Sequence, residues 1–335
     1  MKHVLITGSS GFIGSALVKR LLQRGHELSL VSRDRRRLGV YGSQGARTIE
    51  ADLGNRISLN AIDTGPNPID AVVHLAASVS YFGRDFALHR VNVLGSYHLL
   101  QWAIQRGVRQ YLFASSIEAM GTRGDPDPAG EEDCTPPVSS YGRSKLDAEH
   151  ALLSVQNGNV NLLILRLGNI YGPGSSFLIP FLADVLRRQR GSFRYLPLVL
   201  NQVFQLLYID DLVETLVSVI EQGGGKGTYI LAGKEMLTLE ELLNLTAERL
   251  RIAYAMPSVR KWLPSVLRVR TELAALAGIA DFPAFLMAGE NRGPRRTYRI
   301  DKAIRDLGFA PRTSPAEGIR LMLEGRDAAP EGAVP

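Results

Sequence analysis

The chain has 335 residues, of which 45% are hydrophobic and 21% are charged, and its formal net charge at pH 7 is +6. These values are typical of a globular protein with one large α/β domain, or with two smaller domains that share a core. The start lacks the pattern of a secretory signal, no apolar run reaches about 18 residues, and Cys134 is the single cysteine, so we expect a cytoplasmic protein without a leader, a membrane-spanning segment or an internal disulfide.

Strand and helix patterns alternate through the first half of the chain. Short apolar runs predict strands, and apolar residues at helical spacing that end near a glycine predict helices. In chain order we expect a strand at 3–7, a helix at 12–24, strands at 27–32 and 71–77, a helix at 92–107, a strand at 110–116, a helix at 141–156 and a strand at 161–167. This rhythm predicts a parallel, doubly wound α/β sheet.

The pattern loosens after about residue 170. Residues 205–225 predict a strand, an acidic helix start, a helix and a glycine stop, and 227–233 predicts another short strand. Thr238 and Glu241 form a capping-box pattern that opens a further helix. The segment 254–292 is apolar and punctuated by proline.

Three glycines link the first predicted strand to the first predicted helix. Gly8 permits a tight turn off the strand, Gly11 lets the backbone approach a pyrophosphate, and Gly14 lets the helix lie close to the sheet. The free N–H groups and the positive dipole end of the helix favour a phosphate there. The spacing therefore predicts a Rossmann-type dinucleotide site.

The end of the second predicted strand indicates which dinucleotide binds. An acidic residue there bonds the ribose 2′-hydroxyl of NAD, whereas arginine accommodates the 2′-phosphate of NADP. The chain has Ser32 and Arg33 at this place, and Asp34 comes one step later. We therefore favour NADP(H), with NAD(H) as the alternative. No helix-turn-helix or aromatic-interleaved pattern accompanies the arginines at 33–37, so we expect an anionic small molecule there and no nucleic acid.

A tyrosine and a lysine form a candidate catalytic pair. Tyr141 and Lys145 lie four residues apart at the start of a predicted helix, so their side chains share one face. A neighbouring ammonium favours the phenolate and lowers the phenol pKa from its usual value of about 10. Ser115 and Ser116 end the strand at 110–116, and a serine there can hold a substrate oxygen.

Further motifs follow in order along nearly the whole chain. They are TGSSGFIG (7–14), DL (52–53), HLAA (74–77), VNVLGS (91–96), YGRSK (141–145), RLGNIYGPG (166–174), YIDDLV (208–213), GTYILAG (227–233) and DKAIRDLGFAP (301–311). Together they resemble the extended short-chain dehydrogenase/reductase family, which includes NAD(P)-dependent epimerases and dehydratases. The apolar segment 254–292 is similar to the branch that holds dihydroflavonol reductases and 3β-hydroxysteroid dehydrogenases.

The resemblance implies hydride transfer between a nicotinamide and a secondary alcohol or ketone. In this family's pattern Tyr141 is the general acid/base, Lys145 lowers the pKa of Tyr141 and holds the nicotinamide ribose, and Ser116 bonds the reacting oxygen. Glu118 matches a proton-transferring glutamate of the dehydratases and decarboxylases. The cofactor-binding residues that the motifs indicate are Gly8, Ser10, Gly11, Phe12, Ile13, Gly14, Ser32, Arg33, Asp52, Leu53, Leu75, Ala76, Ala77, Asn92, Tyr141, Lys145, Leu167 and Ile170, and no metal is implied.

The resemblance also implies a domain division and a partner. We expect a Rossmann-type cofactor domain over 1–169 and 204–233, a smaller and mostly helical substrate domain over 170–203 and 234–325, and a tail at 326–335. Members of the family often dimerise through two helices, here 92–107 and 141–156, so we expect a homodimer that acts on a small molecule.

Three departures from the family bear on the substrate. Phe204 stands where sugar-nucleotide members carry an arginine that clamps the substrate pyrophosphate, and an apolar ring cannot pair with phosphate. Glu118 matches the dehydratases, but Ile117 and Met120 do not. The apolar segment 254–292 fits a pocket for an apolar substrate or a membrane-facing surface, and equally a helical domain that packs its own core.

Three functions therefore stay open. We favour an NADP(H)-dependent reductase or dehydrogenase of a small, apolar ketone or secondary alcohol. A nucleotide-sugar epimerase, dehydratase or decarboxylase that works on a retained NAD(P) is the first alternative. A catalytically silent cofactor-binding sensor is the second, against which Tyr141 and Lys145 are both present.

Overall fold

The computed structural model describes residues 1–62, 64–80, 85–121, 127–156, 158–189, 202–254 and 297–327. Apart from Tyr254, the apolar segment predicted at 254–292 lies outside the described residues, and so does the end of the chain from 328. Within the described ranges, no helix has the length and apolar character that a membrane crossing requires.

A seven-stranded parallel sheet forms the centre of the molecule, in the order β10-β6-β5-β4-β1-β2-β3. Its strands are β1 (His3–Thr7), β2 (Glu27–Ser32), β3 (Arg47–Glu50), β4 (Ala71–His74), β5 (Gln110–Ser116), β6 (Asn161–Leu167) and β10 (Gly227–Leu231). The chain winds outward from β1 through β2 to β3, and then in the opposite direction from β4. This order confirms the predicted Rossmann-type, doubly wound sheet.

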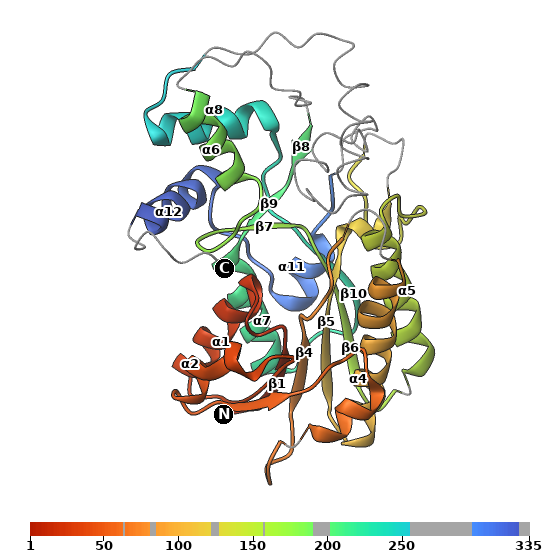
Figure 1. Ribbon diagram of the computed structural model, residues 1–335. Coiled ribbons are helices and arrows are strands. Elements are labelled where there is room, and N and C mark those ends of the chain that lie inside the picture. The colour runs from red at the N-terminus through yellow and green to blue at the C-terminus, as the bar shows by residue number, and fades with distance from the viewer. Residues whose placement is uncertain are drawn as a thin grey trace.

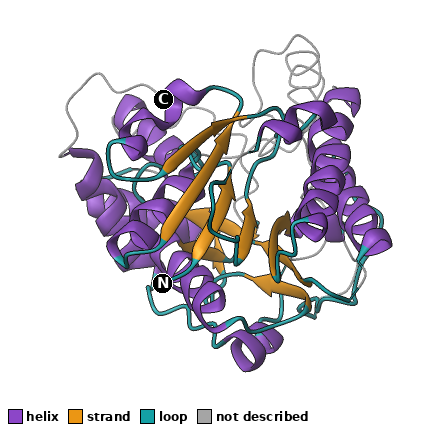
Figure 2. Ribbon diagram, turned by 90° about the horizontal axis from the view of Figure 1, so that it is seen from below, coloured by secondary structure: helices purple, strands orange, loops and turns teal. Residues whose placement is uncertain are grey.

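Helices cover both faces of this sheet (Figures 1 and 2). On one face α1 (Phe12–Gln23) packs against α7 (Ile209–Gln222), and on the other α4 (Gly95–Gln105) packs against α5 (Ser140–Val155). Val4 and Ile6 of β1 join the first core, whereas Leu5 joins the second. Because both faces are covered, β1 reads as a continuous apolar run rather than as an alternating one.

The remaining elements complete the described part of the fold. They are α2 (Gly39–Gly42), α3 (Asp85–Leu88), α6 (Ile179–Gln189), α8 (Leu239–Leu250), α11 (Asp301–Leu307), α12 (Pro315–Asp327), the 3₁₀ helices η1 (Arg35–Leu38), η2 (Arg56–Ala61) and η4 (Ile117–Met120), the π-helix η3 (His89–Leu94), and the strands β7 (Asn169–Tyr171), β8 (Val203–Phe204), β9 (Leu206–Tyr208) and β11 (Leu237–Thr238). Helices α6, α8 and α12 gather in the upper left of Figure 1, away from the sheet.

The bounds of the predicted elements agree with the structure to within two residues, except at two places next to the site. The strand predicted at 71–77 ends at His74, because Leu75, Ala76 and Ala77 leave the sheet to line a pocket. The helix predicted at 92–107 becomes regular only from Gly95, and the residues before it form the π-helix η3. Single π-turns of this kind are frequent at functional sites.

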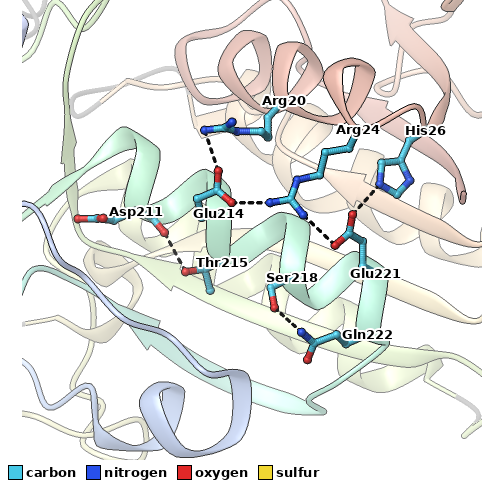
Figure 3. Close-up of polar contacts among 9 residues, drawn as sticks. All are labelled: Arg20, Arg24, His26, Asp211, Glu214, Thr215, Ser218, Glu221 and Gln222. Atoms are coloured by element: carbon cyan, nitrogen blue, oxygen red, sulfur yellow. Dashed lines mark hydrogen bonds and ion pairs between the residues drawn. The ribbon is translucent and has the colours of Figure 1, made fainter.

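Charged side chains join α1 and the start of β2 to α7 (Figure 3). Arg20 lies 2.7 Å from Glu214, and Arg24 lies 2.9 Å from Glu214 and 3.1 Å from Glu221. His26 Nε2 lies 3.0 Å from Glu221 Oε1. The arginines and carboxylates are between 34% and 43% exposed, so each pair contributes only about 0–1 kcal/mol. The buried apolar faces therefore hold these two helices together.

The second aspartate of YIDDLV fastens the C-terminal part of the chain to α7. Asp211 Oδ2 accepts hydrogen bonds from the backbone N–H groups of Arg312, at 3.1 Å, and Thr313, at 2.9 Å. Both donors precede α12, so Asp211 sets where this helix leaves the Rossmann core.

Candidate active site

A pocket of about 480 Å³ opens at the carboxyl edge of the sheet, next to β1 and β4, where the winding direction reverses. Open α/β sheets bind ligands at such a reversal. The sequence-predicted residues that line it are Gly8, Ser10, Gly11, Ser32, Arg33, Asp52, Leu53, Leu75, Ala76 and Ala77. Residues that line it without having been predicted are Val31, Asp34, Arg37, Ala51, Ser78 and Val91.

The glycine loop has the geometry that a phosphate cradle requires. Gly8 has a φ of 72°, and a Cβ there would lie 2.6 Å from the backbone nitrogen of Ala76. A Cβ on Gly14 would overlap the carbonyl oxygen of Gly8, so α1 packs directly on the loop. Gly11 is the N-cap of α1 and has no side-chain cap. The first-turn N–H groups, with Phe12 and Ile13 among them, are therefore available to a phosphate.

We expect Gly14→Ala to lower the free energy of unfolding by about 1–3 kcal/mol, because the new methyl group forces backbone apart. This cost exceeds the gain of about 1 kcal/mol that alanine brings inside a helix. Urea unfolding with and without NADPH measures both the stability and the binding.

The matched control is Gly39→Ala. Gly39 begins α2, and a Cβ there meets nothing within 4 Å. This variant should be as stable as the parent or slightly more stable. A Gly14→Ala protein that unfolds at the parental urea concentration would contradict the close packing.

The pocket end next to β2 is positively charged. Ser32, Arg33 and Arg37 line it, together with Asp34. Hydrogen bonds from Arg36 hold the Asp34 carboxylate, with Nε 2.9 Å from Oδ1, and lower the pKa of Asp34. Arg33 makes no hydrogen bond or ion pair with the described residues. Arg36 thus neutralises the charge of Asp34, whereas Arg33 and Arg37 both contribute positive charge to this end of the pocket.

The predicted acid–base residues meet where β5 ends and α5 begins. The hydroxyl of Ser116 forms a hydrogen bond with the phenol of Tyr141. Lys145 Nζ donates to the carbonyl oxygen of Ala114 over 2.6 Å and lies 5.9 Å from the centre of the Tyr141 ring. The structure therefore brings Ser116, Tyr141 and Lys145 together on the same edge of the sheet as the pocket.

Burial controls the protonation of this pair. Burial raises the pKa of Tyr141 well above its usual range, the charge of Glu118 raises it further, and the Ser116 hydrogen bond partly opposes this. Burial lowers the pKa of Lys145 to about 8, and Glu149 opposes that shift. Desolvation therefore outweighs the lowering of the Tyr141 pKa that a neighbouring ammonium predicts. At neutral pH the phenol is protonated and the lysine is mostly charged.

Glu118 belongs to η4 and lies close to the Tyr141 phenol, against the first turn of α5. Its Oε2 accepts a hydrogen bond from Ser139 Oγ at 3.4 Å, and Ser139 caps α5 by accepting from the Gly142 N–H at 2.9 Å. A Cβ on Gly142 would overlap the Glu118 carbonyl oxygen, so η4 and α5 touch through their backbones. Glu118 is thus placed by the same contact that places Tyr141.

Several predicted cofactor residues lie next to the pocket rather than in its lining. Asn92 is 1% exposed, accepts from Ser78 N at 2.8 Å and donates to Ser144 Oγ at 2.9 Å, so it fastens the pocket wall to α5. Leu167 ends β6 at the carboxyl edge of the main sheet, and Ile170 lies in β7, which forms a separate sheet with β9. Their contact with a cofactor remains a prediction.

A buried histidine supports the pocket floor. His74 Nδ1 lies 2.7 Å from Thr7 Oγ1, and its Nε2 lies 2.8 Å from Ser96 Oγ. Ser96 donates its own proton to Asn92 O, so Nε2 must donate to Ser96 and Nδ1 must accept from Thr7. Thr7 Oγ1 in turn accepts from the N–H of pocket-lining Ala76 at 3.2 Å. This directional chain requires a neutral imidazole.

This histidine predicts a loss of stability in acid. Burial and then the charge of Lys145 lower the pKa of His74 to about 3, against 6.5 in the unfolded chain. Between these values the unfolded state binds a proton that the folded state does not, so stability falls as pH drops from 6.5, by about 2 kcal/mol at pH 5. His74→Gln keeps a donor and an acceptor, and should remove this part of the pH dependence. Urea unfolding of both proteins at pH 7 and pH 5 measures it, and equal pH dependence would contradict it.

Comparison with known proteins agrees with this geometry. Residues 4–232 match the model of the NAD dependent epimerase/dehydratase family. The chain is 26% identical to 2-alkyl-3-oxoalkanoate reductase of Stenotrophomonas maltophilia, over 95% of this chain and 98% of that protein. It is also 26% identical to 4-hydroxy-2-methyl-3-oxo-4-farnesyl-3,4-dihydroquinoline-1-oxide ketoreductase of Stigmatella aurantiaca, over 99% of each chain.

A solved structure extends the comparison to the fold. UDP-glucose 4-epimerase of Thermus thermophilus, in complex with NAD, superposes with a TM-score of 0.74 and 25% identity, over 98% of this chain and 100% of that chain. Together the comparisons confirm the resemblance that the motifs indicated, and the prediction that the chain is an enzyme.

Proposed function

Because this chain belongs to the NAD dependent epimerase/dehydratase family, we propose that it is an NADP(H)-dependent reductase of small, largely apolar ketones. Two relatives that it matches over nearly their whole length are named as reductases of oxo compounds. The reverse reaction, oxidation of the corresponding secondary alcohol, uses the same residues.

The observation that carries this proposal is the charge beside the end of β2. Arg33 and Arg37 line the pocket there, and the nearby carboxylate of Asp34 is held by Arg36. Two guanidinium groups favour the 2′-phosphate of NADP, whereas NAD-binding sites place an acid that bonds the 2′-hydroxyl. Cells commonly draw on NADPH for net reduction, so this end of the pocket favours a reductase that exchanges its cofactor at each turnover.

The chain's own residues suit the reduction of a ketone. The first turn of α1 would hold the pyrophosphate, and a bound reduced nicotinamide would supply the hydride that the carbonyl carbon accepts. Ser116 would bond the carbonyl oxygen, and the protonated phenol of Tyr141 would give it a proton, leaving a secondary alcohol. The ammonium of Lys145 stabilises the phenolate that remains until water reprotonates it.

The place of Phe204 supports an apolar substrate over a sugar nucleotide. Phe204 lies in β8, pairs with Leu237 of β11 and is 2% exposed, so it is part of the core. A buried phenyl ring offers no charge to a substrate pyrophosphate. The names of the two relatives describe oxo compounds that carry an alkyl or a farnesyl group.

A substrate screen tests the proposal. Purified protein is incubated with NADPH or NADH and a series of 2-alkyl-3-oxo esters, and the loss of nicotinamide absorbance is followed. We expect turnover with NADPH that rises with alkyl chain length, and product alcohol in equal amount to the NADPH consumed. Absence of turnover with every ketone, together with conversion of a UDP-sugar, would reject the proposal.

A nucleotide-sugar epimerase or dehydratase is the second candidate, favoured by Glu118. This carboxylate lies close enough to Tyr141 to raise its pKa, and a second proton-transferring group is what dehydration needs. Such an enzyme would keep one cofactor in place and convert UDP-glucose without net NADPH loss. Cofactor that copurifies with the protein, and activity that disappears in Glu118→Gln, would support this candidate.

We also propose the domain division and the homodimer that the sequence implied. The cofactor domain would comprise 1–169 and 204–233, with the substrate domain over 170–203 and 234–325. Helices α4 and α5 pack against each other and would form the dimer contact, which sedimentation of the purified protein tests. The cytoplasmic location also stays a prediction.

A further inference from the structure

The last three residues of β5 each bind one residue of α5. Tyr141, Lys145 and Glu149 follow one another at intervals of four, so they form one stripe along the helix. The three contacts are Lys145 Nζ to Ala114 O at 2.6 Å, Ser115 Oγ to Glu149 Oε1, and Ser116 Oγ to the phenol of Tyr141. The face of α5 that holds Tyr141 and Lys145 thus continues one turn further, to the carboxylate of Glu149.

That carboxylate is buried and fixed from a second strand. Glu149 is 2% exposed and Arg166 of β6 is 5% exposed. Arg166 Nη2 lies 2.7 Å from Glu149 Oε2, and its Nε lies 3.1 Å from Oε1. Arg166 Nη1 donates to Glu131 O at 2.6 Å and lies 3.2 Å from Cys134 Sγ, so the guanidinium is anchored on both sides. Both oxygens of Glu149 therefore have one position relative to the helix.

We propose that Glu149 is a positioning residue for the reaction, whose carboxylate, held by Ser115 and Arg166, keeps Lys145 charged and in place beside Tyr141. The inference rests on the proposed roles of Tyr141 and Lys145. A buried ion pair contributes little net stability compared with apolar residues of the same size. A charge placed one turn from a buried lysine, however, decides whether that lysine keeps its proton.

The groups around Lys145 single out Glu149. Lys145 interacts with His74 on β4 and with Tyr141 and Glu149 on α5. Of the other charged groups here, Glu118 on η4 acts on Tyr141, and Arg166 on β6 binds Glu149. His74 and Tyr141 are neutral at physiological pH, since burial lowers the pKa of the first to about 3 and raises that of the second. Burial lowers the pKa of Lys145 to about 8, and the opposing effect comes from Glu149.

The test is a direct titration of the lysine in the protein without cofactor. The sequence has seven lysines, so with lysine labelled by carbon-13 at Cε the spectrum is small, and the Lys145 signal is the one that Lys145→Arg removes. In Glu149→Gln the pKa of Lys145 should fall by about one unit or more. In Arg166→Met it should stay or rise, because the anion remains and has lost its partner.

Opposite responses separate an electrostatic role from a packing role. A lysine pKa unchanged in Glu149→Gln, or lowered equally in both variants, would overturn the proposal. If either single variant fails to fold, the double variant Glu149→Gln with Arg166→Met removes both partners of their ion pair together, so neither is left without the other. Its Lys145 pKa should also fall, whereas a parental value would overturn the proposal. Glu221→Gln, in the α1–α7 ion-pair group of Figure 3, is the matched control and should leave the Lys145 pKa unchanged.

Activity distinguishes this inference from the proposed function. With an active ketone, the alkaline limb of the pH–rate profile in Glu149→Gln should move to lower pH by the shift seen in the titration. If Tyr141→Phe abolishes turnover but Glu149→Gln changes neither profile nor titration, the function stands and this inference fails. If the lysine titration shifts but Tyr141→Phe remains active, the assigned function fails instead.

Discussion

Replacing Tyr141 with phenylalanine is expected to lower kcat for ketone reduction by about 10²–10⁴-fold, the usual contribution of a general acid. The ring would keep its place in the first turn of α5, and Ser116 would still be present to bond the carbonyl oxygen. The proton that completes the alcohol, however, would have to come from water. Initial rates with NADPH and an active ketone measure the effect, and nicotinamide fluorescence should show that NADPH binding is nearly unchanged.

Tyr111→Phe is the control for removing a buried tyrosine hydroxyl. Tyr111 lies on β5, the strand that ends at Ser116, is fully buried, and its hydroxyl has no hydrogen-bond partner among the described residues. Losing that hydroxyl should leave the rate unchanged and the protein as stable or more stable. A Tyr141→Phe enzyme that keeps the parental rate would remove Tyr141 from the mechanism, and would return the chain to the alternative of a silent cofactor-binding sensor.

The bounds of the central strands could be predicted because strands buried on both faces consist mainly of apolar residues. Strands β1, β2, β5 and β6 are covered on both faces, and each is a short apolar run bounded by polar residues or glycine. Strand β3 has the opposite character. It lies at the edge of the sheet, and Ile49 is its one buried residue, so the four residues Arg47–Glu50 carry no strand pattern.

The site was predictable where its chemistry depends on local spacing. The glycines of the loop and the Tyr141–Lys145 pair each belong to one turn of chain, and they lie where the spacing places them. Arg37 and Val91 reach the pocket through η1 and η3, whose courses the sequence did not indicate. The signal for Arg37 was present in its spacing of four from Arg33.

Protonation was harder to predict than position. The sequence shows an ammonium near a phenol, which predicts a lowered pKa for Tyr141. The structure adds burial of both groups and the carboxylate of Glu118, and these reverse the direction. Likewise the ion pair of Glu149 with Arg166 joins residues from different elements, and nothing in the spacing of the sequence connects them.

The pair Arg33→Ala and Arg37→Ala, combined in one protein, should weaken NADPH binding by about 10²-fold and leave NADH binding within a few-fold of the parent. Each arginine would lose a charge-assisted contact to the 2′-phosphate, which is worth about 1.5–3 kcal/mol when fully formed and less at an exposed position. Both side chains are exposed and line the pocket, so the fold should be unaffected. Titration of nicotinamide fluorescence with each cofactor gives the four dissociation constants.

Arg35→Ala separates a specific contact from the general positive field of the cluster. Arg35 also lies in η1, but it does not line the pocket and its Nε donates to Thr48 Oγ1 at 3.0 Å. A field effect would weaken NADPH binding in this variant nearly as much as in the single Arg33→Ala or Arg37→Ala, and more at low salt than at high salt. If Arg33 and Arg37 contact the 2′-phosphate directly, Arg35→Ala should keep the parental preference for NADPH over NADH. The single variants Arg33→Ala and Arg37→Ala should lose that preference. Equal NADPH and NADH affinities in the parent would instead mean that the arginines are a solvated surface cluster without a cofactor role. That result would favour the nucleotide-sugar epimerase or dehydratase, in which Glu118 transfers a proton.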